Sequence, residues 1–267
     1  MLSKRLALRS AELVTARSQR DEDTISYFEQ YNCIPPPVFM LAITAFEISF
    51  YIYYVVTKHY GLSVSHPVPI DSRLIYDPCK REEAWRFVTY ICIHVGICHI
   101  LVNSIAQLAL GIPLELVHKF WRVGLVYVLG VLAGSLAVSI TEPWLFLVGA
   151  SGGCYALMAA HFSNLVVNWA EMECAVQQLI SLFLLLGADI GVAFYNRFTD
   201  TSLGQRISFA AHGGGLIAGL LMGVVVLRNF RQKPWERVVW WVALVGFSVA
   251  VIACFIWNMF CLQCCHR

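Results

Sequence analysis

Residues 149–168 read GASGGCYALMAAHFSNLVVN, a run of small and apolar residues whose first five positions hold three glycines and Ser151. A helix needs about 20 such residues to cross the hydrocarbon core of a bilayer. The run does not alternate polar and apolar residues, and a helix satisfies its own backbone hydrogen bonds in lipid. The stretch therefore predicts a membrane-spanning helix with Ser151 near its start.

Similar apolar runs lie on both sides of this one. They cover residues 37–57, 93–116, 122–140, 175–195, 207–228 and 237–260. The composition agrees, because 58% of the residues are hydrophobic and only 13% are charged, with a mean hydropathy of +0.66. Soluble domains carry roughly 25% charged residues. The chain is predicted to be an all-α polytopic membrane protein with seven spans.

Polar segments separate and flank these spans. Residues 1–36 are predicted to form a polar tail without a cleaved signal peptide, because no short apolar core lies near the start. Residues 58–92 form the longest connection, and residues 261–267 a short tail. Within the connection, residues 80–87 (KREEAWRF) are amphipathic and predict a short helix at the membrane interface, with Trp85 as its anchor.

Lysine and arginine predict the orientation of the chain. The turns at 117–121 and 229–236 are basic, and with seven spans both lie on the side of the N-terminus, whose tail is also basic. Short cytoplasmic loops carry an excess of such residues, so a cytoplasmic N-terminus is expected. The basic residues of loop 58–92 oppose this assignment, but long loops count less in the rule.

Cysteine pattern and charge exclude several function classes. The ten cysteines include no paired CxxC sets, so no zinc site or other cofactor is expected. Most act as small apolar residues, whereas oxidation or lipidation of Cys261, Cys264 and Cys265 stays open. A net charge of +2 without a basic, aromatic-rich patch argues against a nucleic-acid partner and leaves the lipid bilayer as the expected surrounding.

Polar residues inside apolar spans are the candidates for function. In the second span His99, Asn103 and Gln107 are four apart, so they share one helix face, and His94 lies nearby. Such a face can join helices through hydrogen bonds. It can also supply hydrogen-bond donors to a reacting group.

Small residues recur at intervals of four on two spans: Gly152, Ala156 and Ala160 on the fourth, and Gly215, Gly219 and Gly223 on the sixth. These ridges predict close approach of the two helices. Alone they are explained equally well by tight packing. His212, three residues before Gly215, lies on nearly the same face as its ridge.

The predicted topology places the polar residues at one depth. The second, fourth and sixth spans all enter from the side opposite the N-terminus, so His99, Asn103, Ser151 and His212 lie near that surface. A serine becomes a nucleophile when a base accepts its proton, and His212 can accept and return one. His99, Asn103 and the Ser151 amide can donate to an oxyanion. The set predicts acyl transfer.

Three carboxylates in the spans receive no catalytic role. Asp189 is interpreted as a structural hydrogen-bond partner or as part of a water path, because nothing places it to orient His212. Glu47 and Glu115 are interpreted as structural or interfacial.

Five motifs in order resemble the rhomboid intramembrane proteases across about residues 37–260. They are the Trp85-Arg86 pair of the first loop, the HxxxxHxxxN pattern of His94, His99 and Asn103, the GxSG motif from Gly149 to Gly152, the aromatic Tyr155 that packs on the base, and the base His212 followed by Gly215 and Gly219. A lone GxSG is unspecific, whereas the ordered set is specific. Inactive relatives often carry proline before the serine, where this chain has Ala150.

The resemblance implies a six-helix protease core at 37–228, including loop 58–92, and a linker with a seventh helix at 229–260, as in the animal secretase-type branch. It implies a Ser151–His212 dyad without an acidic third member. Its substrates would be single-pass membrane proteins, growth-factor precursors among them, cut near the outer membrane boundary to release ectodomains. The expected location is the plasma membrane or a secretory-pathway membrane.

Two other functions stay open. One is a protein with the same fold that binds membrane clients without cutting them, which the intact Ser151 and His212 disfavour. The other is an unrelated seven-helix receptor or transporter. That function leaves the common depth of the four polar residues without an explanation.

Overall fold

The computed structural model describes residues 36–64, 67–170, 172, 174–199, 208–229 and 233–260, except for the side chains of 192–199. All but the last residue of the predicted tail 1–36 lies outside this part of the chain. The C-terminal tail 261–267, with its three cysteines, also lies outside it.

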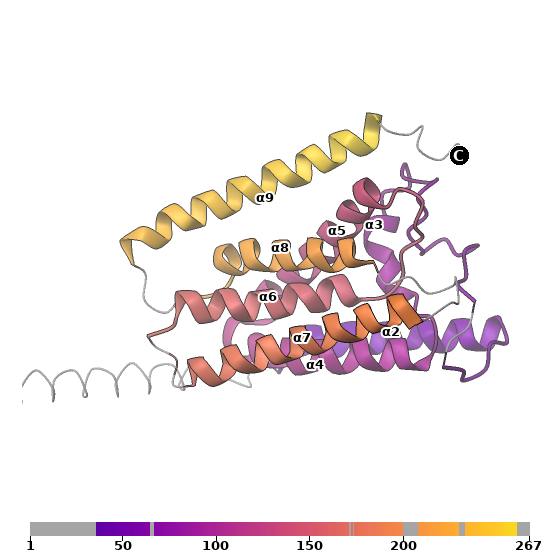
Figure 1. Ribbon diagram of the computed structural model, residues 1–267, viewed down its shortest axis with the longest axis horizontal. Helices are drawn as coiled ribbons and strands as arrows, with labels where there is room; N and C mark the ends of the chain where they lie inside the picture. Colours follow the sequence, from indigo (N-terminus) through magenta and orange to yellow (C-terminus); the bar gives the residue numbers. More distant parts are fainter. Residues whose placement is uncertain are drawn as a thin grey trace, which may run out of the picture.

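All regular secondary structure in the described chain is helical, apart from one isolated bridge between Tyr76 and Leu147. Its elements in order are α2 (Val38–Thr57), α3 (Arg86–Thr89), the 3-10 helix η1 (Tyr90–Cys92), α4 (Ile97–His118), α5 (Phe120–Thr141), α6 (Ser151–Val167), α7 (Ala175–Thr199), α8 (Phe209–Val226) and α9 (Pro234–Phe260) (Figure 1). Each of the seven predicted spans corresponds to one helix, which confirms the all-α fold.

Five helices, α2, α4, α5, α8 and α9, are long and apolar enough to cross a membrane. The other two predicted spans are shorter by this measure. Helix α6 has 17 residues, and the apolar part of α7 covers Ala175–Gly191. Helix α6 lies at the centre of the bundle, where most of its residues are buried by neighbouring helices. The chain is therefore an integral, multi-pass membrane protein.

Two local features determine how the first helices meet. The carboxylate of Glu115 in α4 accepts hydrogen bonds from the backbone amides of Phe39 and Met40, at 2.8 and 2.9 Å. These amides begin α2 and have no partner inside their own helix, so Glu115 caps it. Lys119, with a φ of +72°, is the single residue between α4 and α5 and reverses the chain. The structural interpretation of Glu115 is confirmed.

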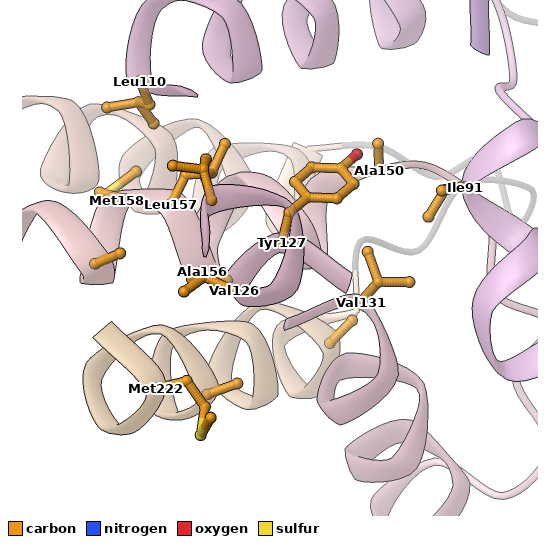
Figure 2. Close-up of a cluster of buried hydrophobic side chains, with 14 of the residues drawn as sticks. Ile91, Leu110, Val126, Tyr127, Val131, Ala150, Ala156, Leu157, Met158 and Met222 are labelled. Atoms are coloured by element: carbon orange, nitrogen blue, oxygen red, sulfur yellow. The ribbon is translucent and has the colours of Figure 1, made fainter. Parts of the chain in front are cut away.

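The core of the bundle consists of α5, α6 and α8, which pack against one another, with α4 beside α6. Figure 2 shows part of this core, where side chains from the four helices meet around Tyr127. Tyr127 also donates to Glu47, at 2.8 Å, and Gln107 donates to the other carboxylate oxygen of Glu47, at 2.9 Å. Glu47 and Gln107 therefore join α2, α4 and α5, so for Gln107 the helix-joining alternative is confirmed.

The two ridges of small residues form the contact between α6 and α8. A Cβ atom added to Gly215 would lie 2.2 Å from the carbonyl oxygen of Gly152, and one added to Gly219 would lie 2.2 Å from that of Ala156. Neither position tolerates a side chain without a shift of backbone. The predicted close approach of the fourth and sixth spans is confirmed.

A pair of glycine substitutions on α8 tests this packing. We expect Gly219→Ala to lower the thermal unfolding midpoint, because overpacking costs about 1–3 kcal/mol and a gain in helix propensity of at most about 1 kcal/mol offsets it only in part. Gly213→Ala is the matched control, because its added Cβ meets nothing within 4 Å. Equal midpoints for the two variants in detergent would contradict the close contact.

The last two helices differ in how they join the bundle. Helix α9 lies along the outer side of α8 and α5 (Figure 1). It is tied there by hydrogen bonds from Asn258 to Ser139, at 2.8 Å, and from Trp240 to the carbonyl of Val225, at 3.0 Å. Helix α7 packs mainly on α6 and presents many apolar side chains outward.

The predicted interfacial helix at 80–87 is wrong in its extent. Residues 80–85 form turns, and the helix begins only at Arg86. The reason lies in Arg86, which is 3% exposed and donates to the carbonyls of Ser72 and Ile75, each at 2.9 Å. Because these hydrogen bonds tie Arg86 to the first loop, residues 80–85 fold as part of that loop and do not form a helix. Trp85 remains 52% exposed, as expected for an anchor.

Candidate active site

Ser151 is the first residue of α6, and the turn before it has an unusual backbone. Gly149 has a φ of +93°, which side-chain-bearing residues rarely adopt. A Cβ atom there would also lie 2.5 Å from Nε2 of His99. The amides of the first helical turn have no partner within the helix. The sequence around Ser151 thus places a hydroxyl and the start of a helix beside a histidine.

His212 faces this serine from α8. Its Nε2 lies 3.0 Å from the Ser151 hydroxyl oxygen, within hydrogen-bond distance. His212 is held in the first turn of α8, where Ser208 caps the helix by accepting from the Ala211 amide at 3.2 Å. Glu142, at the end of α5, contacts the Ser208 hydroxyl in turn. The structure therefore brings together the two residues predicted to form the dyad.

Tyr155 provides the surface under the His212 ring. The two rings are stacked, with centroids 4.1 Å apart and planes 19° from parallel. Tyr155 is 5% exposed, and its hydroxyl donates to the carboxylate of Asp189 in α7. Of the two interpretations of Asp189, the structure agrees with that of a hydrogen-bond partner. Its partner is the residue that supports His212, a connection that the sequence did not reveal.

His99 and Asn103 lie on the opposite side of the serine turn, on α4. The Val95 amide donates to Nδ1 of His99 at 3.4 Å, so a neutral ring carries its proton on Nε2. This Nε2 is the atom that faces Gly149. Asn103 donates one amide hydrogen to the His99 carbonyl at 2.9 Å, which leaves a second for another acceptor. Both side chains thus have a donor near the start of α6.

The first loop holds the turn before Ser151 in place. Tyr76 exchanges two backbone hydrogen bonds with Leu147, at 3.3 and 3.2 Å. The Gly149 amide donates to the carbonyl of Tyr90 at 3.3 Å. Arg86 binds the loop carbonyls on either side of Arg73, and Trp85 donates to the Arg73 carbonyl at 3.1 Å. The Trp85-Arg86 pair therefore acts on the site through the loop.

The remaining supporting residue, His94, is buried next to the site. It is 3% exposed, and its ring meets that of His99 edge to face, with centroids 5.1 Å apart. Neither ring nitrogen has a hydrogen-bond partner in the part of the chain that the structure describes. His94 thus contacts His99 through its ring, and no hydrogen bond joins it to Ser151 among the described residues.

The described residues hold no group of three or more histidine, cysteine or carboxylate side chains that would bind a metal ion.

Comparison with known proteins identifies the fold family. The model of the Rhomboid domain matches residues 81–229, a range that contains Ser151, His212, His99 and Asn103. The chain belongs to the rhomboid family. Mouse Rhomboid-related protein 2 is 43% identical over 238 residues, covering 88% of this chain and 79% of its own length.

Other relatives differ in length and in name. Human Rhomboid-related protein 3 is 40% identical over 246 residues, which are 90% of this chain but 61% of that protein, so the chain spans less than two thirds of it. Inactive rhomboid-related protein 2 of Caenorhabditis elegans is 38% identical over 245 residues. These cover 91% of this chain and 70% of that protein's length. Membership of the rhomboid family is therefore compatible with an active or an inactive site.

Sequence reasoning missed two contributors to this rhomboid site and the partner of a third. The two are Glu142, which contacts the capping Ser208, and Tyr90, whose carbonyl holds Gly149. The third is Asp189, which was interpreted as a hydrogen-bond partner but not matched to Tyr155. Each acts across a helix boundary, and no spacing within one helix signals such a contact. The sequence signal for Asp189 was the presence of a carboxylate in an apolar span.

Proposed function

We propose that this rhomboid chain is an intramembrane serine endopeptidase that uses Ser151 as nucleophile and His212 as general base and acid. The observation that carries the proposal is the 3.0 Å distance between His212 Nε2 and the Ser151 hydroxyl oxygen, at the starts of two neighbouring helices. A hydroxyl is a weak nucleophile until such a base accepts its proton.

The first half of the reaction forms an acyl-enzyme. The Ser151 oxygen attacks the carbonyl carbon of the substrate peptide while its proton moves to His212 Nε2. The carbonyl oxygen becomes an oxyanion, for which His99 Nε2–H, Asn103 Nδ2–H and the Ser151 amide are donors. The C–N bond then breaks, and the proton on His212 passes to the leaving nitrogen.

The second half restores the enzyme. Water attacks the acyl carbon as His212 accepts one of its protons, which forms a second oxyanion beside the same donors. The bond to the Ser151 oxygen then breaks, and that oxygen takes the proton back from His212. The products are a carboxylic acid and free Ser151, so the cycle needs only peptide and water.

The location of the site and the resemblance to rhomboid proteases support the proposed substrates. Ser151, His212 and His99 lie near the starts of three helices, and all three are partly exposed. With a cytoplasmic N-terminus these starts lie toward the outer surface, in the plasma membrane or a secretory-pathway membrane. We infer that residues 37–228 form the protease core, to which 229–260 adds a helix. Single-pass membrane proteins, growth-factor precursors among them, would be cut near the outer boundary and release their ectodomains.

A non-cleaving client-binding protein is the second candidate, because one relative is named inactive. The complete Ser151–His212 pair favours the protease. Reconstitution of the purified chain in liposomes with a tagged single-pass reporter separates the two. The protease is expected to release a soluble fragment that ends near the outer boundary of the reporter helix, as located by mass spectrometry. Co-purification of intact reporter without any fragment would support binding alone.

A further inference from the structure

We propose that Asp189 is a positioning residue for the reaction, and that it acts on His212 through the hydroxyl and ring of Tyr155. This inference rests on the proposed function, since it assigns an indirect acidic group to the Ser151–His212 pair. The contacts that carry it link three helices: Asp189 in α7, Tyr155 in α6 and His212 in α8.

The first step is geometric. A stacked ring under an imidazole limits its tilt, but only if that ring is itself fixed. Tyr155 is 5% exposed, and its hydroxyl is held at the far end by the Asp189 carboxylate. Because the hydroxyl is anchored, the phenol ring keeps its plane, and the 4.1 Å stack keeps Nε2 of His212 directed at Ser151. Pre-set orientation of a base lowers the barrier of the step in which it accepts a proton.

The second step is electrostatic. When His212 accepts the serine proton it becomes an imidazolium, and a cation over an aromatic face is stabilised by the electrons of that ring. A phenol that donates to a carboxylate has a more electron-rich ring, because hydrogen-bonded groups polarise one another in a low-dielectric interior. Asp189 therefore favours the charged form of His212 from the far side of Tyr155, without touching the histidine.

The rest of α7 does not account for an acidic residue at this position. Phe183 meets Phe162 of α6 edge to face, and Leu182 and Leu186 pack on the core, so apolar contacts already join the two helices. A carboxylate inside an apolar span is costly unless it is paired. Pairing with Tyr155 offsets that cost and places the carboxylate on the residue that stacks against His212.

The test is the rate at which a fluorophosphonate probe labels Ser151 in the purified full chain. In this reaction the serine oxygen attacks phosphorus, fluoride leaves, and the serine proton passes to His212. For Asp189→Asn we expect the maximal labelling rate to fall about tenfold with half-saturation by the probe unchanged, because the imidazolium that forms over the Tyr155 ring is stabilised less. Tyr155→Phe keeps the ring and removes the hydroxyl, so a similar loss is expected.

The double variant is decisive, because the two groups are proposed to act as one unit. Asp189→Asn in the Tyr155→Phe background should cause no further loss of rate. Ser181→Ala is the matched control on α7, where the hydroxyl donates to the Gln177 carbonyl on the exposed face, and it should keep the normal rate. A normal maximal rate for Asp189→Asn, or losses that multiply in the double variant, would overturn the proposal. So would weaker probe binding with an unchanged maximal rate.

The same experiment separates the two proposals. If the unaltered chain is labelled at Ser151 and Asp189→Asn behaves like it, only the role of Asp189 fails. If the unaltered chain is not labelled at all, the proposed protease function fails, whatever the Asp189 variant does.

Discussion

Replacing Ser151 by alanine is expected to reduce cleavage of a single-pass reporter by more than about 10³-fold, because without the hydroxyl no acyl-enzyme can form. The fold should not change. The Ser151 side chain is partly exposed, and its observed hydrogen bond is the one to His212. Release of the soluble reporter fragment from liposomes, measured against time at equal protein, gives the rate, and thermal unfolding in detergent checks the fold.

The control for this loss lies on the same helix. Ser163 is also in α6, where its hydroxyl donates to the carbonyls of Ala159 and Leu220, away from the dyad. Ser163→Ala removes an identical group and is expected to cleave the reporter at close to the normal rate. Cleavage by Ser151→Ala at the rate of Ser163→Ala would remove Ser151 from the mechanism.

Loss of an oxyanion donor is the second large effect that we expect. Asn103→Ala or His99→Ala should lower kcat by about 10²–10³-fold, the usual cost of one such donor, with a much smaller change in KM. The reason is that these groups act on charge that develops only after the serine attacks. The measurement is a full rate-against-substrate curve with a fluorogenic transmembrane peptide in detergent.

Ser104→Ala is the matched control for the Asn103 variant. Ser104 is the next residue on α4 and is also buried, but it lies outside the set of proposed donors. Its kcat should stay near normal. If Asn103→Ala and His99→Ala raised KM and left kcat unchanged, their place would be in substrate binding and the oxyanion assignment would be wrong.

Much of the fold could be predicted because lipid imposes simple rules on sequence. A span must be long, apolar and helical, so each of the seven runs corresponds to a helix in the structure. The ridges of glycine and alanine could also be interpreted in advance, since only small residues let helix backbones approach to the distances observed at Gly215 and Gly219. The meeting of Ser151 and His212 followed from the depth of the two helix starts.

The parts that could not be predicted depend on contacts between segments far apart in the chain. Nothing near Arg86 shows that its guanidinium would bind loop carbonyls, so residues 80–85 were expected to be helical and form turns instead. Asp189 and Tyr155 lie 34 residues apart on different helices. Their contact depends on the rotation of α7 about its axis, and the apolar run that predicts the helix does not specify this rotation.

The most direct test of the central claim is labelling of the purified, unaltered chain by a fluorophosphonate probe, followed by peptide mapping. We predict one labelled serine, Ser151, and loss of that label in His212→Ala, because the serine oxygen reacts only when the imidazole 3.0 Å away takes its proton. Labelling that persists at the same rate without His212, or that falls on another serine, would contradict the account.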